Sequence, residues 1–236
     1  MNMSKKNPIS AQPDVLEEGN EKLTETMNNL EYYFEKYKNI ILAILAITLI
    51  SIGGWWGYTN FIKGPKETKA KDAIIYAQRY FEIDSLNAAL KGDGLHLGFE
   101  AIAKQFSGTA GGNRAAFCAG VCNLKLGNYT AAIKYLEDFN TSDAILQARK
   151  FGCLGDAYAE QNKMDNAIEN YTKASEATDN ELVTPLYLFR AALANEKKGN
   201  KKEALELYKK LNTDYPSSQE GMAAELYIAK LEAQTL

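Results

Sequence analysis

The sequence has few of the residues from which catalytic and metal sites are usually built. One histidine and three cysteines occur among its 236 residues. His96 has only Asp93 nearby in the sequence, which is too little to orient a general base. The odd number of cysteines excludes a fully paired disulfide framework, and no second Cys/His pair stands at zinc spacing. We therefore expect no enzyme activity, no metal ion, no cofactor and no small-molecule substrate.

An excess of charge of one sign is also lacking. The formal net charge is −3 and the isoelectric point is near 5.4. The clearest basic cluster, residues 197–202, is surrounded by glutamates that neutralise it. Because nucleic-acid binding needs a concentrated basic face, we expect no nucleic-acid partner.

Charge is absent altogether from one stretch, since no charged residue lies between Lys38 and Lys63. This stretch is strongly apolar from Ile40 to Ile50, and its length matches the roughly 20 apolar residues that a bilayer requires. Tyr37 and Trp56 bracket it, and the helix between them would span roughly 28 Å. We interpret residues 39–62 as a transmembrane helix, and the lipid bilayer as one partner of the chain.

A cleaved signal peptide would fit this segment poorly. The polar stretch before it is too long and contains many acidic residues. The bulky Trp55 and Trp56 occupy the place where a cleavage site of small residues would be expected. An uncleaved signal anchor is the better interpretation.

The orientation of this anchor is left open by charge. Three lysines lie shortly before the segment and five basic residues lie shortly after it. Read literally, the positive-inside rule keeps the following region in the cytoplasm. Long following domains, however, are translocated largely regardless of charge.

Small residues form a stripe within the predicted transmembrane helix, at Ala46, Gly53 and Gly57. Such a stripe allows another membrane helix to approach closely. The alternative is that glycine is simply common in membrane helices.

The region before the anchor divides into two parts. Residues 1–20 are polar and contain Pro8 and Pro13, so we predict a disordered tail. Residues 21–38 predict an amphipathic juxtamembrane helix, because apolar residues recur at spacings of three and four. These residues are Leu23, Met27, Leu30, Phe34 and Tyr37. The helix could lie on the membrane surface, contact a partner, or be an extension without specific contacts.

The region after Pro65 predicts helices only, with a repeat period near 35 residues. The clearest unit, residues 148–184, has Leu154-Gly155, Tyr158, Ala167 and Tyr171. This resembles the tetratricopeptide repeat, with leucine-glycine and tyrosine in a first helix and alanine and an aromatic residue in a second.

Further units are weaker. In residues 113–147 and 185–218, Asn123 and Asn195 replace the expected tyrosine. Residues 66–112 resemble a diverged pair, with a long helix to Leu90 and a turn at residues 92–94, and residues 219–236 predict a capping helix. The expected fold is all-α: one transmembrane helix followed by a tetratricopeptide-type α-solenoid with a C-terminal capping helix.

Stacked helix pairs of this kind form a concave face lined by the first helix of each pair. Outward positions on those helices predict a groove for a protein partner. The candidate residues are Arg114, Phe117, Val121, Arg149, Asp156, Phe189 and Glu196.

The layout as a whole resembles bacterial membrane-anchored tetratricopeptide proteins of the ancillary Sec-translocon-subunit type. The resemblance lies in the anchor at residues 39–62, the turn at 90–94, Gly127-Asn-Tyr129 and Gly155-Asp-Ala-Tyr158. It implies an inner-membrane scaffold with a cytoplasmic N-terminus and a periplasmic repeat domain. The implied partners are Sec translocon subunits, periplasmic chaperones or emerging secreted substrates.

A cytoplasm-facing adaptor or assembly factor for another membrane complex is the alternative. The count of basic residues and the unpaired cysteines favour it.

Overall fold

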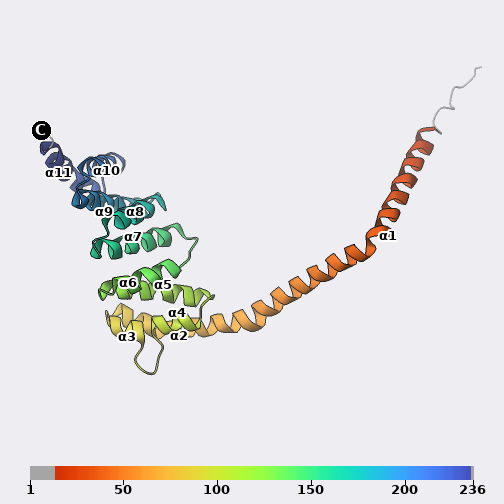
Figure 1. The fold of residues 1–236 in the computed structure, drawn as a ribbon, viewed down its shortest axis with the longest axis horizontal. Coiled ribbons are helices and arrows are strands. Elements are labelled where there is room, and N and C mark those ends of the chain that lie inside the picture. Colours follow the sequence, from red (N-terminus) through yellow and green to blue (C-terminus); the bar gives the residue numbers. More distant parts are fainter. Residues whose placement is uncertain (1–13, 235–236) are drawn as a thin grey trace, which may run out of the picture. The chain divides into compact units, whose positions relative to one another are not determined.

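The structure is a computed structural model that describes residues 14–234. It divides into two compact units, Met1–Ile62 and Lys63–Leu236. Regular structure in the described part of the chain is helical, apart from one isolated antiparallel bridge between Gly92 and Leu97. The expected all-α fold class is confirmed (Figure 1).

The first unit contains a single long helix, α1 (Asp14–Gly57), followed by the π-helical turn η1 (Tyr58–Lys63). The helix begins at Asp14, so the predicted disordered tail of residues 1–20 is wrong for its last seven positions, 14–20. Residues 1–13 lie outside the described residues. No proline interrupts the sequence between Pro13 and Pro65, so the juxtamembrane and apolar segments continue as one helix.

The predicted transmembrane segment ends in the π-helical turn rather than in α-helix. Thr59 Oγ1 and Asn60 Nδ2 both donate to the carbonyl oxygen of Trp56, each at 2.9 Å. These side chains compete with backbone donors for that carbonyl, which accounts for the wider turn.

The apolar part of this helix meets the requirements for a membrane span by length and composition. The helical run Thr26–Glu82 contains an 18-residue window with a mean hydropathy of 2.1, and no residue of this window is buried. A soluble core helix would instead be buried.

The second unit consists of ten helices within the described residues. They are α2 (Gly64–Glu82), α3 (Leu86–Lys91), α4 (Phe99–Gln105), α5 (Ala110–Lys125), α6 (Tyr129–Asp138), α7 (Ala144–Glu160), α8 (Met164–Glu176), α9 (Val183–Lys198), α10 (Lys201–Asp214) and α11 (Gln219–Ala233). From α5 to α11 they stack as successive antiparallel neighbours (Figure 1).

Each helix pair in this unit turns in the same way. A residue with positive φ follows the first helix at Asp84, Gly127, Asn162 and Gly199. The backbone N–H of the next residue donates to a carbonyl five positions earlier, at 2.8–2.9 Å. The four acceptor residues are Tyr80, Asn123, Tyr158 and Asn195. This is the Schellman arrangement that ends a helix in the left-handed conformation.

The two asparagines that replace the expected tyrosine have a structural role at these turns. Asn123 Oδ1 accepts from Asn128 Nδ2 at 3.3 Å, and Asn195 Oδ1 accepts from Asn200 Nδ2 at 3.1 Å. Each asparagine also donates to the carbonyl one turn earlier in its own helix. In these two repeats a pair of amides joins the first helix to the turn, whereas the other two repeats have Tyr80 and Tyr158 at the same position.

The first pair differs from the expected one. The predicted long helix to Leu90 is broken at residues 83–85, where Asp84 has φ of 58°. The true turn lies there, and residues 92–98 form a loop that interrupts the second helix between α3 and α4. Gly98 is required in this loop, because a Cβ there would lie 2.4 Å from the Leu90 carbonyl oxygen.

Small residues hold the paired helices together. An alanine nine positions after each Schellman acceptor is fully buried, at Ala89, Ala132, Ala167 and Ala204. Close contact is most evident at Gly155, where an added Cβ would lie 2.5 Å from the ring of Tyr171. The helices therefore approach closely, and large side chains fill the space around each contact.

The last helix, α11, covers the end of the stack with only part of its apolar surface. Ala224 and Leu231 are buried against α9 and α10. Met222 and Leu226 are 59% and 73% exposed. These two residues therefore do not help to cover the last repeat.

Candidate functional site

The first helices of the pairs form one continuous inner surface. Helix α2 contacts α5, α5 contacts α7, α7 contacts α9, and α9 contacts α11. The second helices α4, α6, α8 and α10, all fully described, make no such contacts with one another. Because the second helices are spread apart, the stack curves, and the first helices line its concave side.

Two of the predicted groove residues are exposed arginines on this concave side. Arg114 lies on α5, and its guanidinium donates to Gln78 Oε1 of α2 at 3.3 Å. Arg149 is exposed on α7. Val121 lies between them in sequence and is partly buried on α5. This part of the groove offers cationic groups beside apolar surface.

Three other predicted groove residues are half-buried and contact other side chains of the protein. Phe117 packs against Phe139, with ring centroids 4.9 Å apart. Phe189 packs against Tyr208 and Tyr227, at 5.7 and 5.3 Å. Glu196 accepts from Lys230 Nζ at 2.7 Å. Sequence spacing alone does not show these contacts, and the role of the three residues in a partner groove stays a prediction.

Asp156 is half-buried, and it joins three helices. Its carboxylate accepts two hydrogen bonds from Arg190 of α9, at 2.6 and 2.7 Å, and one from the Tyr171 hydroxyl of α8, at 2.8 Å. Burial, together with the Asp156 carboxylate, raises the pKa of Tyr171 far above its ordinary value. The arrangement fixes α7, α8 and α9 in register. Arg190 was not predicted, since its partner lies 34 positions away.

The cysteines are poor nucleophiles in this setting. Burial raises the pKa of Cys153 to about 11 and that of Cys122 to about 12, and it also raises the pKa of Cys118. All three are free thiols. Because the thiolate is the reactive form, these side chains serve packing between helices.

His96 and Asp93 have a structural role in the loop of residues 92–98. Asp93 accepts from the His96 and Leu95 backbone N–H groups and from the Tyr80 hydroxyl, and it pairs with the His96 ring at 2.9 Å. The hydrogen bonds from His96 hold the pKa of Asp93 well below its ordinary value. The His96 ring stacks on Tyr76 at 3.6 Å. Among the described residues, no group of three or more His, Cys, Asp or Glu side chains could hold a metal ion.

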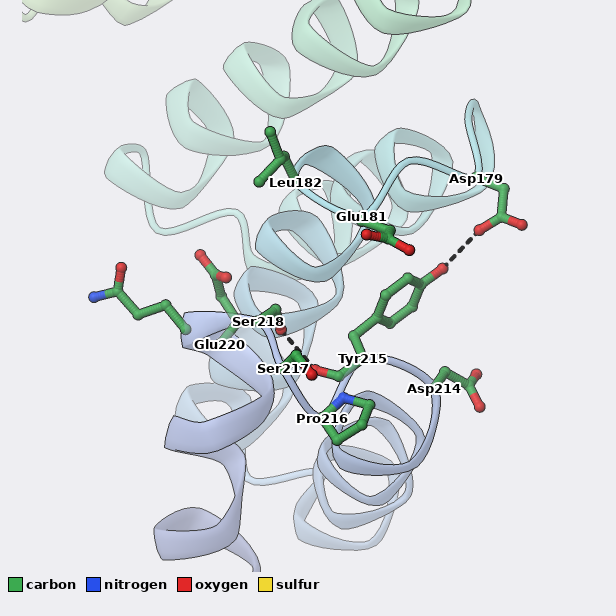
Figure 2. A pocket seen from close by; sticks show the side chains of 10 residues that line it. Asp179, Glu181, Leu182, Asp214, Tyr215, Pro216, Ser217, Ser218 and Glu220 are labelled. Atoms are coloured by element: carbon green, nitrogen blue, oxygen red, sulfur yellow. Dashed lines mark hydrogen bonds between the residues drawn. The ribbon is translucent and has the colours of Figure 1, made fainter.

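A separate hollow of about 940 Å³ lies where the α8–α9 connection faces the α10–α11 turn. Figure 2 shows Tyr215 of the α10–α11 turn extending toward the α8–α9 connection. Its hydroxyl donates to Asp179 Oδ1 at 2.9 Å. The residues that line it include four acids, Asp179, Glu181, Asp214 and Glu220, and no lysine or arginine. This hollow is wide open and its carboxylates are scattered. A formed ligand pocket instead encloses its ligand and directs a few polar groups toward it.

Comparisons with known proteins agree with this architecture. Residues 154–218 match the family model described as tetratricopeptide repeat. A search of curated proteins found no match. The chain is similar to the structure titled "Crystal structure of MamA protein", with 17% sequence identity and a TM-score of 0.51 over 72% of this chain and 88% of that chain. In its described residues the chain is thus of the all-α class, and its second unit is a tetratricopeptide-type solenoid.

Proposed function

We propose that this chain is a membrane-anchored scaffold for protein–protein interaction. One observation supports the proposal most strongly: a helix that is long and apolar enough to span a bilayer occurs in the same chain as a tetratricopeptide solenoid. Such solenoids present extended concave surfaces that bind protein segments. The anchor would restrict that surface to partners at or near the membrane.

More specifically, we propose that the chain is an accessory subunit of the Sec translocon at the bacterial inner membrane. The N-terminus would be cytoplasmic, and the repeat domain would be periplasmic, where it would meet chaperones or emerging secreted substrates. The resemblance of the layout to that class supports this form. In the groove, exposed Arg114 and Arg149 would attract acidic side chains of the partner.

A cytoplasm-facing adaptor is the second candidate. Three free cysteines favour it, because unpaired thiols persist most readily in a reducing compartment. The two candidates differ in the side of the membrane on which the repeat domain lies.

The groove can be tested by site-specific photo-cross-linking in intact cells. A photoreactive residue at Arg149 on the concave side should form adducts with translocon subunits or with periplasmic chaperones. The same residue at Glu169, which is exposed on the second helix α8, is the matched control and should give only background. Equal adducts at both positions would show that the concave side is not the binding surface.

A further inference from the structure

Apolar side chains of α1 that precede the uncharged segment are exposed in the single chain. Leu23, Met27, Leu30 and Phe34 are each more than 60% exposed, and Tyr37 is 41% exposed. A continuous stripe of large apolar groups on one helix is a surface that another molecule or a membrane normally covers. The question is which partner fits it.

The spacing of this stripe is that of a coiled-coil seam. From Leu23 to Tyr37 the intervals alternate between four and three residues, which are the d and a positions of a heptad. Ile41 and Ile44 occupy the next a and d positions. A globular core helix would carry a wider apolar face.

Charges next to the seam are compatible with two parallel copies. In such a pair each g position faces the e position of the following heptad in the other chain. Thr26 would face Glu31 of the partner subunit, and Tyr33 would face Lys38 of the partner subunit. No two like charges meet along the seam, and Glu35 and Lys36 lie at outward b and c positions.

The a and d positions continue into the apolar span, where small polar residues occupy the next two of them. Thr48 and Ser51 take the next a and d positions, and their hydroxyls donate to the Ile44 and Ile47 carbonyls at 2.8 and 2.7 Å. Because these hydroxyls are satisfied within the helix, they allow close helix contact without unpaired polar groups. Ala46 and Gly53 lie at f positions on the opposite side, so the small-residue stripe remains available to another membrane helix.

The membrane surface fits the stripe less well than a second copy does. Residues 14–38 contain seven acidic residues and three lysines, whereas helices that lie on anionic bilayers carry a basic polar face. The seam is also large enough for a dimer. Phe34 and Tyr37 are 61% and 41% exposed, so these residues from two chains would bury about 300–500 Å² before the aliphatic residues are included. A standard interface buries about 1,600 Å² in total.

We propose that residues 23–44 of α1 pair with the same segment of a second copy in a parallel, two-stranded coiled coil that continues into the apolar span. The repeat domain would then be presented in two copies, which strengthens binding to a partner that offers two sites. The inference concerns α1 alone and does not depend on the identity of the translocon as a partner.

Disulfide trapping of the full-length chain in native membranes tests this proposal. In a background with Cys118, Cys122 and Cys153 replaced by serine, single cysteines are placed at Leu23, Met27, Leu30 and Phe34. Asn28, Asn29 and Tyr32 are matched controls at b, c and f positions. Only seam positions bring Cα atoms of two copies within disulfide range, so oxidation should give dimers several-fold more at the seam than at the controls. Equal trapping at all positions, trapping on the opposite face, or no dimer at all would overturn the proposal.

A second measurement does not depend on the cysteine-free background. The unaltered chain purified in detergent should have the mass of a dimer by light scattering. The double variant Leu23→Glu/Leu30→Glu should be monomeric, whereas Asn28→Glu should remain dimeric. A monomeric unaltered chain, or a dimer that survives the double change, would contradict the coiled coil even if the chain is anchored in the membrane.

Discussion

Replacing Tyr208 by alanine should lower the free energy of unfolding of the C-terminal repeats by about 3–5 kcal/mol, the usual loss for a large aromatic core residue. Tyr208 is fully buried. Its ring lies 4.9 Å from that of Tyr227 and 5.7 Å from that of Phe189. It therefore joins α9, α10 and α11, and its removal leaves a cavity where the three helices meet.

The matched control is Tyr208→Phe, which removes only the hydroxyl group that donates to Glu196 at 3.4 Å. That change should cost about 1 kcal/mol or less. Hydrogen exchange of the full-length chain is the measurement. Because each repeat contacts only its neighbours, the alanine variant should lose amide protection in α9–α11 and keep it in α5. Uniform loss along the solenoid, or equal effects of both changes, would contradict this packing.

The second large effect concerns the apolar segment of α1. Replacing Leu45 and Leu49 together by arginine should make membrane insertion less favourable by roughly 6–8 kcal/mol. Each arginine at the centre of a span costs about 2.5–3.5 kcal/mol, and the small favourable contribution of each replaced leucine is lost as well. Both leucines are more than half exposed, so neither change removes a contact within the chain. The chain should move from the membrane pellet to the soluble fraction after alkaline extraction.

The control for this experiment is the double alanine variant, Leu45→Ala/Leu49→Ala. It shortens the same side chains but adds no charge, and it should remain in the membrane pellet. If the arginine variant also stays in the pellet, then α1 does not span the bilayer, and the repeat domain must be held at the membrane by other contacts.

The repeats could be predicted where close helix contacts impose small residues. Leu154-Gly155, Ala167 and Tyr171 form a local pattern, and a glycine beneath a tyrosine ring can be inferred from spacing alone. The amide pairs at Asn123 and Asn195 could not be inferred in this way. Each depends on a second asparagine five positions later that completes the turn.

The turn of the first repeat was misplaced because a glycine-rich segment that is not the turn follows it closely. Asp84 adopts the left-handed conformation that glycine usually provides, whereas the glycine-rich residues 92–94 belong to an inserted loop. The contacts of the groove side chains could not be predicted. Phe189 packs against rings of α10 and α11, and Asp156 binds Arg190 of α9, and these neighbours are set by how the helices stack.

Protease accessibility tests the central claim most directly, namely that the repeat domain is held outside the cytoplasm by one membrane helix. Protease added to intact spheroplasts should digest residues 66–236 while a cytoplasmic marker protein stays intact. A tag placed before Asp14 should be protected until the membrane is broken. If the repeat domain itself survives until detergent is added, the domain faces the cytoplasm and the proposed periplasmic role is contradicted.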